Sequence, residues 1–249
     1  MHSGVIIQAR LGSTRLPGKM MMPFYKDKSL FEVILENISV TIPVEKICLA
    51  TSTKPENDAL CRQAVQHGIH VYRGSENDVL VRFVEAARAL GWESVVRVCA
   101  DNPFLYSPSI SKLITLTSNN LHDYASWFFK DGTPAIRTHS GYYPEWVRVS
   151  ALEKVNTLTK DSFYHEHVTN YIYEHDTVFK LKKLFVEEDG FLKNIRLTID
   201  TQADFDRSQK IFRALYSGKP IDILALKKYL SDKPDILLEM KNAINSHAK

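Results

Sequence analysis

The chain has 249 residues, of which 44% are hydrophobic and 24% charged, values typical of a folded globular protein rather than a disordered, fibrous or membrane-embedded one. Its 32 basic and 29 acidic residues leave a formal charge of +3, too balanced for a surface devoted to nucleic acid or to a bilayer. Cys48, Cys61 and Cys99 lack zinc spacing, and their odd number argues against a disulfide framework. No apolar span or secretory pattern is found, so we expect a cytoplasmic protein with no nucleic-acid or membrane partner.

The first half of the chain alternates apolar, β-branched runs with amphipathic segments. The runs predict buried strands over residues 4–9, 46–51 and 94–100, and residues 69–72 are predicted to be extended. Apolar residues at helical spacing predict helices over residues 29–40, 57–66 and 78–90. Parallel neighbours must be joined by covering connections, so this alternation predicts an α/β fold with a doubly wound, mostly parallel, Rossmann-like sheet. Ligands of such sheets bind at the carboxyl ends of the strands.

The pattern loosens in the second half of the chain. Aromatic segments between residue 124 and about 149 predict antiparallel strands laid across the main sheet. A helix over 161–174, an extended segment over 179–186, a short strand over 195–199 and a helix over 204–216 follow. Residues 221–246 predict two packed helices divided by Pro234. We find no repeat or linker, and predict a single domain over residues 1–249 with an excursion at about 124–186.

The loop after the first strand has the composition of an anion site. Residues 10–19 read RLGSTRLPGK, with three cations, two hydroxyls and two glycines. Gly12 and Gly18 allow main-chain N–H groups to approach a polyphosphate, which the cations would neutralise. The phosphate-binding P-loop pattern fails, because five residues separate the glycines and Met20 replaces the hydroxyl. The dinucleotide fingerprint is absent, and a solvated basic loop is the alternative interpretation.

The run IIQARLGSTRLPGK closely resembles the opening of the cytidylyltransferases of the spore-coat polysaccharide SpsF type, relatives of the enzymes that make CMP-sialic acid and CMP-3-deoxy-manno-octulosonate. Further segments resemble later motifs of that family, at residues 72–82, 97–103, 165–168 and 196–201. The resemblance implies a fold of the nucleotide-diphospho-sugar transferase type. It also implies transfer of CMP from CTP to a sugar, sugar acid or related acceptor, with release of pyrophosphate, in surface polysaccharide synthesis. The family often forms homodimers through the excursion.

Two aspartates are candidate metal ligands. Asp101 follows a predicted buried strand, and Asp200 ends the predicted strand over 195–199. Magnesium prefers a few carboxylate oxygens completed by water and substrate phosphate. The resemblance implies that both residues hold Mg²⁺ or Mn²⁺. The alternative is that each caps the turn or helix that follows it.

The resemblance also implies the residues that bind CTP. Nucleotidyl transfer needs charge stabilisation more than covalent chemistry, and Arg10, Lys19 and Asp101 are the candidate catalytic residues. The implied nucleotide-binding residues are Gln8, Ala9, Arg10, Gly12, Ser13, Thr14, Arg15, Lys19, Thr51, Ser52, Arg73, Asp78 and Arg82. Preference for CTP over UTP is implied by the family rather than by these residues.

The acceptor site is less defined by the sequence. Its candidates are His139, Tyr143, Glu145, His165 and His167. The last two stand two positions apart on a predicted helix and share no face, so they are poor joint metal ligands. Their alternative role is structural, with Glu166 pairing locally. The aromatic run between residues 127 and 146 lines an acceptor pocket or a dimer interface.

Two positions depart from the family pattern. Asn102 stands where the family often has cysteine, and Tyr143 where it often has an acid, which indicates a different acceptor. Two other functions remain as alternatives. One is a nucleotide-sugar-dependent glycosyltransferase, although Asp101-Asn102-Pro103 lacks the usual Asp-x-Asp motif. The other is a non-catalytic nucleotide-binding protein of polysaccharide assembly.

Overall fold

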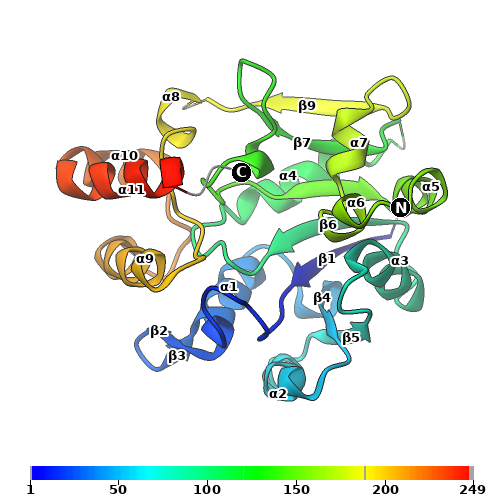
Figure 1. Cartoon of the computed structure of the whole chain (residues 1–249), viewed down its shortest axis with the longest axis horizontal. Helices are drawn as coiled ribbons and strands as arrows, with labels where there is room; N and C mark the ends of the chain where they lie inside the picture. The colour runs from blue at the N-terminus through cyan, green and yellow to red at the C-terminus, as the bar shows by residue number, and fades with distance from the viewer. Residues whose placement is uncertain (1, 120, 188, 247–249) are drawn as a thin grey trace.

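The computed structural model describes residues 2–119, 121–187 and 189–246. Seven strands form one sheet in the order β5-β4-β1-β6-β8-β7-β9 (Figure 1). Their bounds are β1 Ser3–Gln8, β4 Ile47–Ser52, β5 His70–Gly74, β6 Ser94–Cys99, β7 Tyr124–Phe128, β8 Glu145–Arg148 and β9 Leu181–Phe185. Among these strands β8 runs antiparallel to its neighbours β6 and β7, and the other pairings are parallel. The prediction of a mostly parallel α/β sheet is confirmed. A separate hairpin joins β2 (Pro23–Tyr25) to β3 (Lys28–Ser29).

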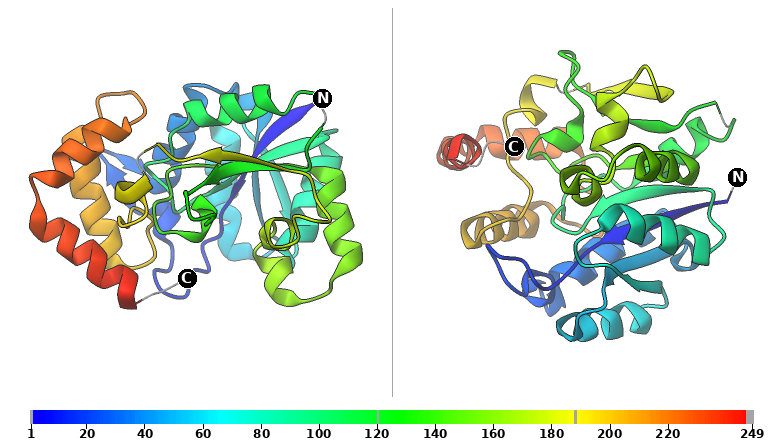
Figure 2. Two further views of the ribbon diagram at one scale, coloured as in Figure 1. Left: turned by 90° about the horizontal axis from the view of Figure 1, so that it is seen from above. Right: turned by 45° about the vertical axis from the view of Figure 1, so that its right-hand side comes forward.

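Helices cover both faces of the sheet (Figure 2). The α-helices are α1 Leu30–Ser39, α2 Asp58–Gln66, α3 Val79–Ala89, α4 Pro108–Leu116, α5 Val149–Leu158, α6 Ser162–Glu166, α7 Asn170–Glu174, α8 Asp189–Leu192, α9 Gln202–Leu215, α10 Ile223–Ser231 and α11 Pro234–Ser246. Short 3-10 helices occupy Lys19–Met21, Val44–Lys46, Pro55–Asn57 and Ala135–Arg137. Within the described part of the chain, no helix is both long and apolar enough to cross a bilayer.

The central strand β1 divides the core in two, because its side chains alternate between the faces of the sheet. Val5 and Ile7 belong to the cluster that includes α1, α4 and α9. Ile6 belongs to the cluster that includes α3 and α5. Burial on both faces explains why the strand is a continuous apolar run.

Local signals fix where several helices begin. The Ser29 hydroxyl accepts from the Glu32 backbone N–H while the Glu32 carboxylate accepts from that of Ser29, a complete capping box for α1. The Asp78 carboxylate caps α3 by accepting from the Val81 backbone N–H at 2.9 Å. The C-terminal segment divides as predicted, with Pro234 in the first turn of α11.

Three predicted elements were wrong. The helix over 161–174 is two short helices, because α6 ends at Glu166, α7 begins at Asn170, and Val168 between them has a φ of 45°. The segment 195–199 forms no strand: the backbone N–H groups of residues 197–199 donate to the loop carbonyls of His139 and Asp101 rather than to a neighbouring strand. The strands of the excursion do not lie across the main sheet. They continue it, because β8 pairs directly with β6.

Candidate functional site

The parallel strands β1, β4, β5 and β6 end along one edge of the sheet (Figure 1). The glycine-bearing loop leaves β1 at this edge. Thr51 and Ser52 end β4 there, and Arg73 lies at the end of β5. Asp101 follows the end of β6 by two residues. The topology therefore gathers the predicted nucleotide and metal residues at the ligand-binding edge of the sheet.

The glycine-bearing loop is closed by its own backbone. The Leu11 carbonyl accepts from the backbone N–H groups of Ser13 at 2.9 Å and Gly18 at 3.0 Å. Gly18 has a φ of 70°, in the left-handed region that favours glycine. The buried Asn57 side chain accepts from the Leu11 N–H at 2.8 Å and donates to the Ser52 hydroxyl at 2.8 Å. The loop is thus held against the end of β4.

Two of the loop cations contact one distant segment. Arg15 Nη2 lies 2.7 Å from Asp200 Oδ1, and Lys19 Nζ donates to the Ile199 carbonyl at 2.5 Å. The Ile199 backbone N–H in turn donates to the Asp101 carbonyl at 2.9 Å. The structure therefore brings the phosphate-loop candidates together with both metal candidates.

The third loop cation pairs with a carboxylate that the sequence interpretation missed. Arg10 Nη1 lies 2.9 Å from Glu76 Oε1, and Lys54 Nζ lies 3.7 Å from the same oxygen. Burial alone would raise the pKa of Glu76, but the Ser52 hydroxyl, Arg10 and Lys54 together hold it below its ordinary value. Glu76 follows a strand end, which is a signal for a site.

Asp101 has the open carboxylate oxygen that a divalent cation needs, whereas both oxygens of Asp200 are paired with arginines. Asp101 Oδ1 is buried and has no hydrogen-bond partner, which is costly unless a ligand completes it. Neither residue is a helix cap, because Ser107 precedes α4 and Thr201 caps α9. The described residues contain no cluster of three or more His, Cys, Asp or Glu suited to a metal. A cation held here would take two carboxylates and complete its shell with water and phosphate oxygens, as Mg²⁺ commonly does.

A buried arginine network supports Asp200. Arg196 has no exposed surface, donates to Asp204 Oδ1 at 2.8 Å and Oδ2 at 2.7 Å, and lies 3.0 Å from Asp200 Oδ2. Burial alone would raise the pKa of Asp204, but Arg196, Arg207 and the Thr201 hydroxyl hold it well below its ordinary value. The sequence interpretation gave no role to Asp204 or Arg207.

Several predicted nucleotide residues are occupied by neighbouring groups. Arg73 Nη1 lies 2.6 Å from Asp58, and Arg73 Nε donates to the Ser52 carbonyl at 3.2 Å. Arg82 is buried, which lowers its pKa, and donates to the Ser75 carbonyl at 2.5 Å. Gln8 Oε1 accepts from Arg97 Nε at 3.2 Å. Ala9 and Thr51 are buried, and Thr14 is exposed on the loop.

The predicted acceptor residues are not gathered in one place. Glu145 has no exposed surface, and its carboxylate accepts from Arg97 at 2.7 Å, from Thr169 at 2.9 Å and from the Tyr124 hydroxyl. His139 is buried beside Arg196, 2.7 Å from Nη1.

Tyr143 lies beside Trp127, with ring centroids 4.5 Å apart and stacked. Burial raises the pKa of Tyr143 to about 12. The aromatic run of this region is therefore packed into the fold, with Trp127 4% exposed.

The two candidate histidines of the excursion, His165 and His167, differ in their surroundings. His165 is buried, with Nδ1 2.9 Å from Asp78 Oδ2 and Nε2 3.0 Å from the Thr159 carbonyl, so both ring nitrogens have partners. This geometry favours the structural alternative for His165. His167 is exposed and packs on Phe163, with ring centroids 4.8 Å apart. Glu166 pairs with Arg10 Nη2, across 4.0 Å.

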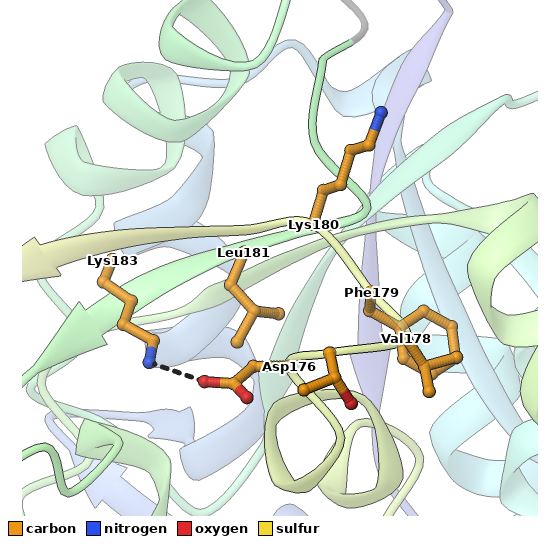
Figure 3. Close-up of a pocket in the computed structure, with 7 residues that line it drawn as sticks. Asp176, Val178, Phe179, Lys180, Leu181 and Lys183 are labelled. Atoms are coloured by element: carbon orange, nitrogen blue, oxygen red, sulfur yellow. Dashed lines mark hydrogen bonds and ion pairs between the residues drawn. The ribbon is translucent and has the colours of Figure 1, made fainter.

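An open pocket of about 400 Å³ lies elsewhere, around residues 176–183 at the amino end of β9 (Figure 3). Asp176 and Lys183 face each other across 3.2 Å at its side. None of the sequence-predicted site residues lines it. The predicted site residues Arg10, Lys19 and Asp101 lie at the opposite edge of the sheet, which is therefore the candidate functional site.

The family model of cytidylyltransferases matches residues 4–229. The chain belongs to the cytidylyltransferase family. The resemblance seen in the sequence is thereby confirmed. This cytidylyltransferase is 29% identical to the spore coat polysaccharide biosynthesis protein SpsF of Bacillus subtilis, over 94% of this chain and 96% of SpsF.

Solved structures agree with this family. A cytidylyltransferase from Leptospira borgpetersenii superimposes with a TM-score of 0.84 at 28% identity, over 95% of this chain and 97% of the other. CMP:2-keto-3-deoxy-manno-octonic acid synthetase, solved with CTP, superimposes with a TM-score of 0.64 at 14% identity, over 86% and 99%. At that identity the likeness shows the fold, which confirms the nucleotide-diphospho-sugar transferase type.

Proposed function

We propose that this enzyme transfers CMP from CTP to a sugar, sugar acid or related acceptor, releasing pyrophosphate, in surface polysaccharide or glycan synthesis. The observation that carries the proposal is that Arg15 and Lys19 contact Asp200 and Ile199. The Ile199 backbone N–H in turn bonds to the Asp101 carbonyl. The CTP bound to the synthetase of like fold supports the nucleotide, and the name of SpsF supports the pathway.

In the proposed reaction an acceptor oxygen attacks the α-phosphorus of CTP. The bond from that phosphorus to the bridging oxygen breaks, and pyrophosphate leaves with the electron pair. Arg10 and Lys19 would neutralise the charge that grows on the leaving group, because fixed cations in a partly dry site stabilise such charge strongly. A bound Mg²⁺ or Mn²⁺, held by Asp101 and Asp200, would supply further positive charge to the phosphates.

The remaining residues would position the substrates. The backbone N–H groups of Gly12 and Thr14 would approach the triphosphate, and the ends of β4 and β5 would contact base and ribose. Asn102 and Tyr143, which depart from the family pattern, would shape the acceptor site. The proposal includes a homodimer formed through the excursion, supported by exposed Phe185 on the edge strand β9.

The test is pyrophosphate release from CTP and Mg²⁺ with a panel of sugar acids and sugar phosphates. We expect Lys19→Ala to lower the rate by about 10²–10³, as loss of a transition-state donor does. Lys46→Ala removes an equal charge from the exposed surface at the amino end of β4 and should leave the rate unchanged. Near-normal turnover of Lys19→Ala would refute the proposed role. CTP binding without turnover on any acceptor would favour the non-catalytic alternative.

A further inference from the structure

The Asp200 carboxylate divides its two oxygens between two different arginines. Oδ1 lies 2.7 Å from Arg15 Nη2, and Oδ2 lies 3.0 Å from Arg196 Nη2. The two partners differ in burial, because the Arg15 side chain is 52% exposed and the Arg196 side chain has no exposed surface. One oxygen therefore faces a replaceable partner and the other a fixed one.

Arg196 is fixed by a second carboxylate. Its Nε and Nη2 donate to the two oxygens of Asp204, which is 1% exposed. Asp204 Oδ2 also accepts from the backbone N–H groups of Asp200 at 3.2 Å and Thr201 at 3.1 Å. Breaking one member of such a buried network leaves an uncompensated charge, which is strongly unfavourable. Asp204 thus orients both the backbone and the side chain of the residue proposed to hold the cation.

Arg15 is bound far less firmly. It lies on the loop after β1, and its side chain is half exposed, so water competes for the guanidinium and weakens its pairing with Asp200. The proposed function requires two changes at this pair. The guanidinium must turn to the triphosphate, and the carboxylate must accept a cation. The two changes are compatible. When Arg15 turns to the triphosphate it frees the Asp200 carboxylate, and a cation bound to that carboxylate frees Arg15.

We propose that Arg196, held by Asp204, is a positioning residue that leaves Oδ1 of Asp200 exchangeable, and that Arg15 occupies this oxygen until a divalent cation and the nucleotide arrive together. This inference rests on the proposed function, because it needs a triphosphate to receive Arg15. Nucleotide binding draws Arg15 away from Asp200 and so opens that carboxylate to the cation. The cation neutralises Asp200, which otherwise competes with the nucleotide for Arg15. Each ligand therefore strengthens binding of the other, and the coupling is reciprocal.

The experiment measures Mn²⁺ binding by the full chain without nucleotide, using electron paramagnetic resonance of free Mn²⁺. Arg15→Gln removes the competitor, so we expect its Mn²⁺ affinity to rise by about three- to tenfold over wild type. Its CTP affinity in EDTA should fall, because the triphosphate loses a cation. Lys54→Gln is the matched control: it removes one charge from the same edge, and Lys54 pairs with Glu76 rather than with Asp200. We expect its Mn²⁺ affinity to stay within about twofold of wild type.

Each other result has a defined meaning. Equal Mn²⁺ affinity in wild type and Arg15→Gln overturns the exchange. An equal rise in Mn²⁺ affinity in Arg15→Gln and Lys54→Gln also overturns it, because the loss of any nearby positive charge would then explain the rise. If wild type binds no CTP, the proposed function itself fails. Asp204→Asn tests the positioning role: Mn²⁺ affinity should fall with the far-ultraviolet circular dichroism unchanged. If Asp204→Asn does not fold, the Mn²⁺ affinity of Arg15→Gln still decides whether Arg15 competes with the cation.

Discussion

At the scale of single residues, the site holds a negative charge where phosphate is expected. Glu76 is 15% exposed at its side chain and pairs with Arg10, one of the proposed catalytic cations. A carboxylate in this position neutralises Arg10 and Lys54 before any nucleotide arrives. Because its pKa is held below the ordinary value, Glu76 stays charged at neutral pH. If a triphosphate binds to these cations as proposed, Glu76 competes with it for them.

Glu76→Gln should strengthen CTP binding. Removing the competing charge frees Arg10 and Lys54, and we expect the affinity to rise by about two- to tenfold at low salt, with the gain shrinking at high salt. Isothermal titration calorimetry in EDTA measures this without metal. Glu45→Gln, an exposed carboxylate in the 3-10 helix before β4, serves as control and should bind CTP like wild type. Weaker binding by Glu76→Gln would show that Glu76 instead orients Arg10 for the ligand.

At the scale of elements, the sequence predicted the strands and helices that carry periodicity and caps. β1, β4 and β6 are buried apolar runs, and α1 and α3 begin at side-chain caps, so local signals suffice. α5 was missed because β8 ends at Arg148 and α5 begins at Val149, with no turn residues between them. α4 was missed too, and its buried Ile110 and Leu113 give only a short apolar pattern.

The segment 195–199 shows what periodicity cannot reveal. Its apolar alternation is typical of a strand, but a strand needs a partner, and the segment lies beside two loops instead. The Leu197 and Thr198 N–H groups donate to the His139 carbonyl. In an alternating strand the polar Arg196 would face solvent. Here it is buried instead, and it donates to the Asp204 carboxylate. The network depends on tertiary contacts, so the roles of Asp204 and Arg207 could not be predicted from spacing.

The turn at Gly141 joins these loops and should tolerate no side chain. Gly141 has a φ of 55°, and a Cβ there would lie 2.6 Å from Asn102 Oδ1. Strain and overpacking together predict that Gly141→Ala lowers the free energy of unfolding by about 2–4 kcal/mol. Gly218→Ala is the matched control, with a φ of 87° but open space around the Cβ, and should cost about 1 kcal/mol. Urea denaturation measures both, and equal losses would contradict the clash.

At the scale of the whole molecule, the excursion is part of the main sheet. β8 inserts between β6 and β7, and Glu145 at its start bonds to Arg97 of β6 and Tyr124 of β7. Glu145 is therefore fixed to the same core as β6, the strand that leads to Asp101. The pairing of the excursion's strands could not be predicted from the sequence, because register depends on partners far along the chain.

Buried ion networks also make the stability of the molecule depend on pH. The folded pKa of Asp204 is depressed, so its contribution is fully present above the unfolded value of about 3.9 and is lost as pH falls toward the folded value. We expect the free energy of unfolding to decline from about pH 5 downward. Asp204→Asn should lose about 3–5 kcal/mol at pH 7, since Arg196 loses its partner, and should show a shallower decline in acid. Asp27→Asn, on an exposed turn, should retain the wild-type slope. Chemical denaturation between pH 3 and 8 measures all three, and parallel acid slopes for wild type and Asp204→Asn would show that other carboxylates control the acid limit.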